Sequence, residues 1–439
     1  GPLFLAMNRN KRSIVLDLKT DADKETARKL IAGADVVIEN FRPGVMDRLG
    51  LGSSAMAASS PRLIYCSLPG FASDDPRAQV RAWEGVVAAA TGTYRPNPEV
   101  NKDQPVYTVI PFSSAYGAFL CAVSVAMALN ARERSGLGQR IEVPLFDATF
   151  TAMGARGMKV HNHPEVPPPF NWSRPALCKD GRWITYVANN LRHPAFLKEM
   201  GADEWIKAGL PPEELATRFA ELFARRSSME WEDVCARIGT ECVTCNTSAE
   251  WLEHPQAAAT KIIDTFVDPE LGRFRGPGIN ARLSDTPGAV RSARPKLNQH
   301  RDDILKEVAA AKPAPAGNAG EIGLRSVLQG VKVLDLCIIL AGPACGRTLA
   351  EFGADVIKID DPRRNPLRFH HDINRGKRTI LLDLKSDGVN DVVRDLRTAK
   401  ELDQIPLLVF ARDATTETDA LSGASDVDLV NFVERQRSI

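Results

Sequence analysis

The sequence has no excess of charge of either sign. Its 439 residues include 56 Lys and Arg against 55 Asp and Glu, which gives a formal net charge of +1. A nucleic-acid surface or an acidic tail would need a marked imbalance, so nucleic acid is not an expected partner. A hydrophobic content of 44% with 25% charged residues is typical of a soluble globular protein.

Long apolar runs and a charged-then-apolar leader are also missing. No run approaches the roughly 20 apolar residues that a membrane-spanning helix needs, so a membrane is not an expected partner either. The chain begins with Gly1-Pro2 and not with Met, which predicts a processed, engineered or fragmentary chain.

The eight cysteines do not form the spacing of a disulfide framework. This favours a reducing compartment, and we expect a cytoplasmic protein. Cys242 and Cys245 have CxxC spacing, but no second pair follows that would complete a zinc site, and we expect small buried residues in a turn. His161 and His163 lack an evident third ligand, so no metal site is predicted.

The first seventy residues predict strands alternating with a helix. Arg12–Lys19 is rich in β-branched residues and predicts a strand, and Thr20–Gly33 predicts a helix that has a capping residue at its start and a glycine at its end. Ala34–Asn40 and Arg62–Leu68 predict two further strands. Strands and a helix at this spacing are typical of a parallel βαβ sheet.

The middle of the chain predicts one long helix and then a second domain. Ala115–Arg132 predicts a buried helix, capped by Ser113 or Ser114, whose small residues let a neighbouring element approach closely. Gly181–Ala188 predicts a strand. Amphipathic helices over 211–252 and short strands over 262–291 complete a smaller domain.

Two distant segments are nearly identical. Asn8–Lys19 matches Asn374–Lys385 almost residue for residue, 366 positions apart, across a Pro- and Gly-rich linker at 312–320. So long a period predicts a duplicated domain. The first copy lacks what would precede Asn8 and the second breaks off soon after Asp387, which predicts a truncated tandem protein. The predicted parts are a large α/β domain at 1–174, a small domain at 175–290, a return segment and linker at 291–325, the start of a second large-domain copy at 326–400, and a divergent tail at 401–439.

The stretch Gly138–Asp147 predicts a short apolar strand that ends at a carboxylate, with a helix behind it. Ligands collect at the carboxyl ends of strands in open α/β sheets. Asp147 is therefore a candidate for attack on an electrophile, or it caps the helix that follows. This stretch alone leaves both interpretations open.

Several ordered motifs together resemble the class III CoA-transferase family (CaiB/BaiF type), which includes formyl-CoA transferase and α-methylacyl-CoA racemase. They are Gly138-Gln through Asp147, Ala34-Asp-Val-Val-Ile-Glu-Asn-Phe-Arg-Pro-Gly44, the repeated Asn-Arg-x-Lys-Arg segment, and Val333-Leu-Asp-Leu with Ala341-Gly-Pro and Gly353-Ala-Asp-Val-Ile-Lys-Ile359. The resemblance covers residues 3–305 and 326–397. It implies a Rossmann-like parallel sheet, a second, smaller α+β domain, and two chains interlocked like rings. The expected assembly is a homodimer, or an intramolecular pseudo-dimer of the two copies.

The resemblance implies a reaction as well. In this family such an Asp attacks an acyl-CoA thioester, so Asp147 is the expected nucleophile. Glu84 in Trp83-Glu84 is the second expected catalytic residue, an acid beside Asp147 that would steer or polarise it. Coenzyme A would be bound as a substrate, with a carboxylic acid as acceptor and no permanent cofactor. Lys19 and Arg48 suit its phosphates, and Phe41 suits its adenine. The full set implied for CoA binding is Leu16, Asp17, Leu18, Lys19, Asn40, Phe41, Arg48, Leu49 and Arg81.

The sequence departs from the family pattern in ways that define the alternatives. Racemases of the family use a His in a Gly-His-Asp segment, but the corresponding residues here are Ala82-Trp-Glu-Gly85, which disfavours racemisation. Ile338-Ile-Leu-Ala-Gly342 replaces a polar loop that contacts CoA. An acyl-CoA racemase and a catalytically incomplete CoA-binding partner domain are therefore the alternatives to a CoA-transferase.

Overall fold

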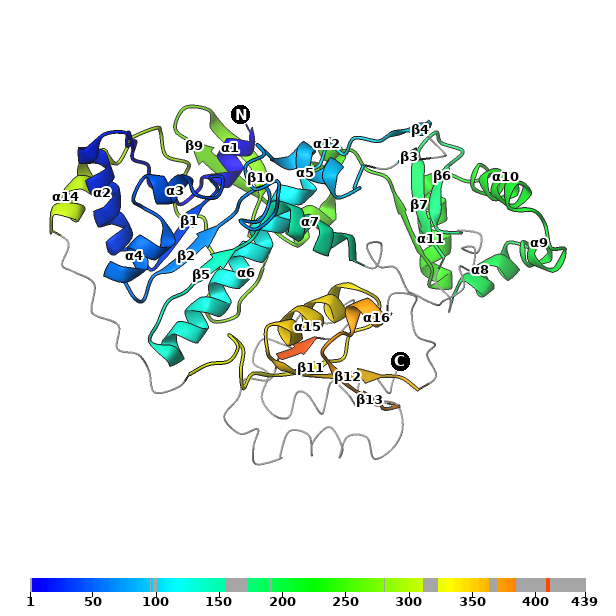
Figure 1. Ribbon diagram of the computed structural model, residues 1–439. Helices are drawn as coiled ribbons and strands as arrows, with labels where there is room; N and C mark the ends of the chain where they lie inside the picture. The colour runs from blue at the N-terminus through cyan, green and yellow to red at the C-terminus, as the bar shows by residue number, and fades with distance from the viewer. Residues whose placement is uncertain are drawn as a thin grey trace. The chain divides into compact units, whose positions relative to one another are not determined.

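The protein is described by a computed structural model that covers residues 2–94, 96–97, 101–154, 172–188, 192–279, 281–310, 323–362, 370–383 and 408–410. The described chain divides into two compact units. Figure 1 labels the helices and strands of both. The smaller unit contains residues 2–12 and 172–295, and the larger contains 13–154 and 296–410. In the described residues, the chain thus passes from the larger unit (13–154) to the smaller one (172–295) and returns to the larger unit at residue 296. The five-part division expected from the sequence stays a prediction.

A parallel three-stranded sheet organises the larger unit. Its order is β1 (Val36–Glu39), β2 (Ile64–Ser67) and β5 (Arg140–Glu142). Both pairings are parallel, and Glu39, Ser67 and Glu142 are register partners in one row. The last residues of the three strands therefore lie together at the carboxyl edge of the sheet, where open α/β sheets bind ligands.

Helices cover both faces of this sheet. Thr20 caps α2 (Asp21–Ala32) by accepting a hydrogen bond from the Asp23 N–H, as the sequence predicted. On that face, Ala27 of α2 and Met56 of α4 (Ser53–Ser59) share a buried cluster with Leu63 and Tyr65. On the other face, Cys66 and Val143 pack against Cys121 of α6 (Phe112–Ser135) and Ala148 of α7 (Leu145–Met153). Short elements complete this part: α3 (Val45–Arg48), α5 (Glu84–Ala90), α14 (Arg301–Ala310), β3 (Pro96–Asn97) and β4 (Asn101–Pro105).

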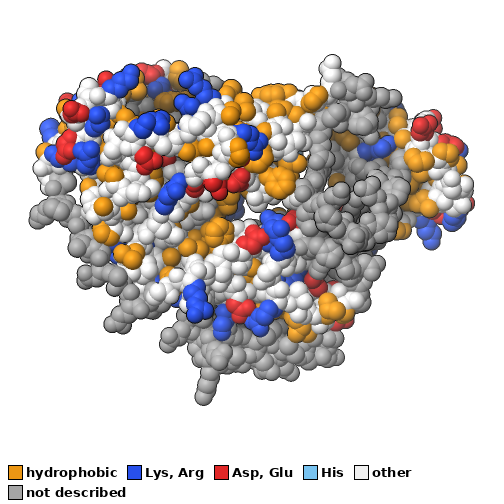
Figure 2. All heavy atoms as spheres, in the orientation of Figure 1, with side chains coloured by type: hydrophobic (Ala, Val, Ile, Leu, Met, Phe, Trp, Pro, Cys, Tyr) orange, Lys and Arg blue, Asp and Glu red, His pale blue; other side chains and the backbone are white. Residues whose placement is uncertain are grey.

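Helix α6 is longer and more apolar than the sequence reading allowed. An 18-residue window of this 24-residue helix has a mean hydropathy of 1.7, so by length and composition alone it could cross a membrane, a criterion that the buried core helix of a soluble protein also meets. One of its faces packs into the unit through Cys121 and Met127. Phe119 and Val123 are exposed, and hydrophobic side chains are visible at the surface where α6 runs (Figure 2).

A second parallel sheet in the larger unit is formed by the C-terminal segment, which we define as the described residues 323–362, 370–383 and 408–410. Its order is β13 (Arg378–Leu381), β12 (Asp355–Asp360), β11 (Lys332–Asp335) and β14 (Leu408–Phe410). The helices of this part are α15 (Ala341–Glu351) and α16 (His370–Ile373). Leu328, Val333 and Val356 form a buried cluster with Met127 of α6, so the segment is packed against that helix.

The repeated sequence adopts two conformations. In the second copy, residues 378–381 form β13, which pairs with β12. In the first copy, residues 12–17 are not a strand, so the strand expected over Arg12–Lys19 was wrong. There the Ser13 and Val15 N–H groups donate to the His300 ring and the Asn298 side chain at 3.1 and 2.8 Å. A strand needs a partner strand for its backbone groups, and side chains occupy that place here.

The smaller unit has its own core. An antiparallel sheet of β6 (Arg174–Leu177), β7 (Trp183–Val187) and β8 (Glu241–Thr244) packs its buried side on aromatic residues such as Tyr186, Phe219 and Trp231. A hairpin of β9 (Ile263–Asp268) and β10 (Gly272–Pro277) lies in the same unit. Its helices are α1 (Pro2–Met7), α8 (His193–Glu199), α9 (Asp203–Lys207), α10 (Pro212–Phe223), α11 (Ser228–Ile238), α12 (Ser248–Glu253) and α13 (Pro255–Ala259).

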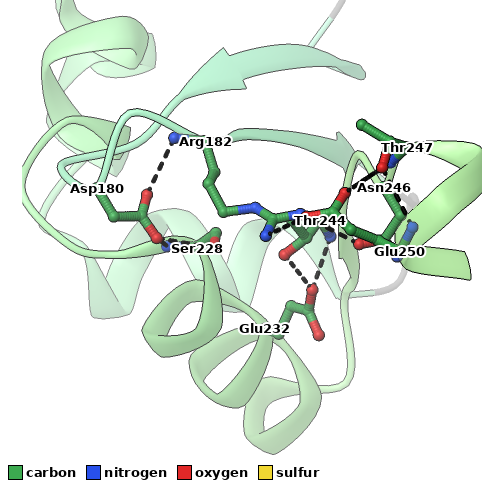
Figure 3. Close-up of polar contacts among 8 residues, drawn as sticks. All are labelled: Asp180, Arg182, Ser228, Glu232, Thr244, Asn246, Thr247 and Glu250. Carbon is green, nitrogen blue, oxygen red and sulfur yellow. Dashed lines mark hydrogen bonds and ion pairs between the residues drawn. The ribbon is translucent and has the colours of Figure 1, made fainter. Parts of the chain in front are cut away.

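Polar side chains fasten the helices of this unit to its sheet (Figure 3). Asp180 accepts from the Ser228 N–H and hydroxyl at 2.9 Å, and Glu232 accepts from the Thr244 N–H at 2.7 Å. Thr244 belongs to β8, as does Cys242. The expectation of buried CxxC residues in a turn was therefore wrong, because Cys242 lies in a strand and Cys245 is exposed.

The predicted fold class is confirmed. A Rossmann-like parallel sheet flanked by helices is joined to a smaller α+β unit. The strands expected over 34–40 and 62–68, the helix over 20–33 and the strand over 181–188 are all present.

Candidate functional site

Asp147 lies in the first turn of α7, five residues after β5 ends at Glu142, so the expectation of a strand that ends at Asp147 was wrong. The helix N-cap is Pro144, so the interpretation of Asp147 as the capping residue was wrong. The Leu145 and Phe146 N–H groups at the helix start donate to the carbonyls of Pro69 and Gly70 at 2.9 and 3.0 Å. The Asp147 side chain is exposed, and among the described residues none donates a hydrogen bond to it. A carboxylate in this position is fixed in space yet free to react.

The surroundings of Asp147 disfavour its charged form. Partial burial, followed by the charges of Asp75, Asp74 and Glu142, raises the pKa of Asp147, and Arg77 opposes the shift. Like charges and lost hydration make the ionised carboxylate less stable than it would be in water. Such a perturbed group at the edge of a sheet is a candidate for chemistry.

Arg77 holds the loop that lies over the start of α7. Its guanidinium lies 4.2 Å from the centre of the Phe71 ring and 4.5 Å from that of Phe146. It also binds both carboxylate oxygens of Asp75, at 3.0 and 2.8 Å. Cation–π contacts and a bidentate ion pair together fix this loop beside Asp147. The sequence reading missed Arg77, because no motif links residue 77 to residue 146.

Glu84 is the first residue of α5, and its side chain lies at the N-terminus of α6. It is 9% exposed, and its carboxylate accepts from the Ser113 and Ser114 N–H groups at 2.9 and 2.7 Å. Burial alone would raise the pKa of Glu84, but the hydrogen bonds from Ser114 and Ser113, of which that from Ser114 has the larger effect, lower it. The expectation that Ser113 or Ser114 caps α6 was wrong, because Glu84 supplies the acceptor from the neighbouring helix.

A first cavity, which we call the edge cavity, lies at the carboxyl edge of β1, β2 and β5 and has a volume of about 240 Å³. Glu39, Ser67 and Glu142 at the strand ends line it, together with Phe41. Other residues in its lining were not among those expected to bind CoA: Arg42, Ser53, Ser54, Ser73 and Arg140. Alternation along β5 would have revealed Arg140, because it shares a face with Glu142.

The residues predicted to bind CoA divide into two groups. Leu16, Leu18 and Leu49 pack against the buried cluster of Leu51 and Tyr65, so their side chains belong to the core and do not line the edge cavity. The others reach the surface. Asp17 closes the turn before α2 by accepting from the Lys19 N–H at 3.0 Å. The exposed members of the predicted set are Asp17, Lys19, Asn40, Phe41, Arg48 and Arg81, and of these Phe41 lines the edge cavity.

A second cavity, the α6–α7 cavity, has a volume of about 310 Å³ and includes Asp147 in its lining. It shares Arg140 and Glu142 with the edge cavity. Arg140 donates to Glu142 at 2.9 Å, and Glu142 also accepts from the Ser73 N–H and hydroxyl at 2.8 Å. The two cavities therefore meet at a fixed polar group. Within the described chain, no set of three His, Cys, Asp or Glu side chains is arranged to hold a metal ion.

Comparison with known proteins identifies the relatives. The chain is 28% identical over 469 aligned residues to the CoA-transferase/lyase DddD of Marinomonas sp. (strain MWYL1), covering 90% of this chain and 56% of that protein. It is 29% identical to the acetyl-CoA:oxalate CoA-transferase of Acetobacter aceti, covering 70% and 82% of the two chains. The chain thus spans little more than half the length of DddD.

The fold is found in solved structures too. A CaiB/BaiF family protein from Brucella suis superposes with a TM-score of 0.58 at 27% identity, covering 70% of this chain and 84% of that one. Rv3272 from Mycobacterium tuberculosis has the same fold, with a TM-score of 0.59 at 23% identity over 69% and 83% of the two chains. The model of CoA-transferase family III matches residues 1–301 and 328–399, and this chain therefore belongs to CoA-transferase family III.

Proposed function

We propose that this protein transfers coenzyme A from an acyl-CoA thioester to a carboxylic acid, with Asp147 as the nucleophile. The observation that carries the proposal is the position of Asp147. Its carboxylate is exposed in the first turn of α7 and lines a cavity that meets the edge cavity at Arg140 and Glu142. Relatives named as CoA-transferases support the same reaction class.

The proposed reaction begins when the Asp147 carboxylate attacks the thioester carbonyl. The carbon–sulfur bond breaks, which leaves a mixed acyl-aspartyl anhydride and the CoA thiolate. The thiolate then attacks the aspartyl carbonyl, the donor acid leaves as a carboxylate, and an aspartyl-CoA thioester remains. The acceptor carboxylate then attacks the aspartyl-CoA thioester, which releases the CoA thiolate and leaves an anhydride between the acceptor and Asp147. The thiolate attacks the acceptor carbonyl of this anhydride, which forms the acceptor acyl-CoA and regenerates the Asp147 carboxylate.

The edge cavity is the proposed place for CoA. Phe41 offers a ring for the adenine, and Arg42 and Arg140 offer cations for phosphate oxygens. Lys19, Arg48 and Arg81 are exposed and complete the proposed set, with Asn40 beside Phe41. Glu84 is proposed to act through structure, because its hydrogen bonds to Ser113 and Ser114 occupy its carboxylate.

Covalent trapping tests this proposal. After incubation with an acyl-CoA, mass spectrometry of proteolytic peptides should find an acyl or CoA adduct, or its hydroxylamine product, on Asp147. Asp147→Asn should lose transfer activity by at least about 10³-fold, as enzymes do when a nucleophile is removed. The neighbouring exposed acid provides the control, since Asp74→Asn should keep the adduct.

The outcomes separate the alternatives. Full activity in Asp147→Asn, with no adduct in the wild type, would refute the proposal. Tight binding of CoA without transfer to any acid would instead identify a CoA-binding partner domain. Exchange of the α-hydrogen of a 2-methylacyl-CoA with solvent deuterium would identify a racemase.

A further inference from the structure

The α6–α7 cavity is apolar over most of its wall. Leu120 and Met127 of α6 line it together with Ile141 of β5. Asp147 and Glu142 are its acidic members, and Arg140 lies where it meets the edge cavity. A pocket of about 310 Å³ is at the lower end of the range for small-ligand sites, roughly 300–1,000 Å³.

Part of that wall comes from the C-terminal segment. Val327 and Phe352 line the cavity, although they follow Asp147 by 180 residues or more along the chain. The Leu328 N–H donates to the Phe352 carbonyl at 3.1 Å, so the two residues are held side by side. Gly353 makes this possible: its φ is +96°, and a Cβ there would lie 1.9 Å from the Ser326 hydroxyl oxygen.

The segment is fixed to the helix that forms the opposite wall. Leu328, Val333 and Val356 share one buried cluster with Met127, which itself lines the cavity. Arg134 near the end of α6 donates to the Gln329 carbonyl at 2.5 Å. The wall is thus a packed surface whose shape is defined by side chains of both elements.

Building on the proposed transfer reaction, we infer that the α6–α7 cavity receives the acyl chain of the thioester, and that Phe352 and Val327 limit its length. When the thioester carbonyl lies at Asp147, the Arg140–Glu142 group and the edge cavity are on one side of it. The apolar wall of the α6–α7 cavity is on the other side. The CoA moiety, with its phosphates, suits the first side. A hydrocarbon chain suits the second, and each buried methylene is worth roughly a fourfold gain in affinity.

This assigns the C-terminal segment a role in the specificity of the site that contains Asp147. Phe352 and Val327 are specificity-determining residues that do not take part in bond making. A smaller side chain at Phe352 or Val327 makes the α6–α7 cavity longer, whereas a larger side chain at either position makes the cavity shorter.

The test uses straight-chain acyl-CoA thioesters with two to ten carbons and the full-length chain. Phe352→Ala and Val327→Ala should shift the optimum of kcat/KM to longer chains, with the longest gaining about tenfold relative to the shortest. Phe352→Trp should shift it to shorter ones. Leu381→Ala is the matched control, because Leu381 belongs to the same segment, is 64% exposed and does not line the cavity.

A binding measurement separates this inference from the transfer mechanism. Non-hydrolysable acyl-CoA thioethers are titrated by calorimetry into Asp147→Asn and into Asp147→Asn/Phe352→Ala. A chain-length profile that shifts with Phe352→Ala supports the inference even if no transfer occurs. Equal effects of Phe352→Ala on every chain length, or affinity that is independent of chain length in both proteins, would overturn it.

Discussion

Asp147, the proposed nucleophile, is an exposed carboxylate with no ion-pair partner among the residues that the structure describes. Burial and three neighbouring acids raise its pKa, while the one cation that opposes them, Arg77, is itself bound to Asp75. A group whose charged form is disfavoured in the fold weakens that fold when it ionises. Sites of this kind commonly trade stability for activity.

The first prediction concerns the effect of the ionised Asp147 carboxylate on the stability of the fold. Asp147→Asn should be more stable than the wild type at pH 7, because the folded wild type holds an ionised carboxylate that the unfolded chain hydrates better. The folded pKa is raised, so the destabilisation is absent below the unfolded pKa of roughly 3.9 and grows as pH rises through the folded value. Urea unfolding of both proteins between pH 4 and 8 should show a gap that closes toward low pH.

If the difference in unfolding free energy between Asp147→Asn and the wild type stays constant over this pH range, the substitution acts through packing. Asp74→Asn provides the control, since that residue is also exposed and acidic. Its own gap should remain smaller at every pH, because Asp74 is exposed and acts on Asp147 only through its charge.

Glu84 is the second case in which one carboxylate has a defined structural effect. Glu84→Ala leaves the Ser113 and Ser114 N–H groups at the start of α6 without their acceptor, and should lower the free energy of unfolding by about 1–3 kcal/mol. Because the pKa of Glu84 is lowered, this stabilisation is present above the unfolded pKa and is lost as pH falls through the folded value.

Chemical denaturation at pH 7 and near pH 3 measures both effects of Glu84→Ala. Glu221→Ala, at an exposed position of α10, should change stability by less than about 0.5 kcal/mol. A loss at pH 7 no larger than that of the control would exclude a capping role for Glu84.

At the scale of elements, the repeated segment isolates what a partner strand contributes. Lys377 precedes β13 and is fully buried, with its ammonium 2.6 Å from Asp335 and 2.7 Å from the Pro343 carbonyl. Its counterpart Lys11 is exposed and donates to Asn8 at 3.3 Å. The same lysine in the same local sequence is thus a buried anchor in one copy and a surface residue in the other.

We predict a large difference between these two lysines. Lys377→Met should destabilise the chain by about 3–5 kcal/mol, because it leaves the buried Asp335 carboxylate without its cation. Lys11→Met should cost less than about 0.5 kcal/mol. Thermal unfolding followed by circular dichroism measures both, and similar losses in the two variants would disprove the assignment.

The double variant Asp335→Leu/Lys377→Met sharpens this test. Removing both charges together should recover much of the stability lost in Lys377→Met, since the unpaired buried charge is then gone. If the double variant is less stable than Lys377→Met by the full loss that Asp335→Leu causes alone, the two residues act separately.

At the scale of the whole molecule, local sequence predicted the elements that depend on local rules. Thr20 and Gly33 mark the ends of α2, and the strand-forming segments that begin at Val36 and Ile64 became β1 and β2. The strand over Arg12–Lys19 failed because its formation depends on a partner that local sequence does not specify. Element ends and turns follow from neighbours in sequence, whereas strand pairing follows from neighbours in space.

The candidate site was predicted only in part for the same reason. Asp147 and Phe41 belong to recognisable motifs, but Arg77, Val327 and Phe352 reach the site from distant parts of the chain. No periodicity connects residue 352 with residue 147, so only three-dimensional packing brings them to one cavity. The interlocked homodimer, the pseudo-dimer and the cytoplasmic location stay predictions.

The two conformations of the repeated segment also bear on how the chain folds. While β12 is forming, two nearly identical segments, 12–18 and 378–384, are available to its free edge, and either would satisfy the same alternation of side chains. The choice between them is made outside the repeat, because Asn298 and His300 occupy the backbone of the first copy. Two polar side chains outside the repeat thus take hydrogen bonds from the first copy that a pairing strand would otherwise take, and so disfavour its pairing with β12.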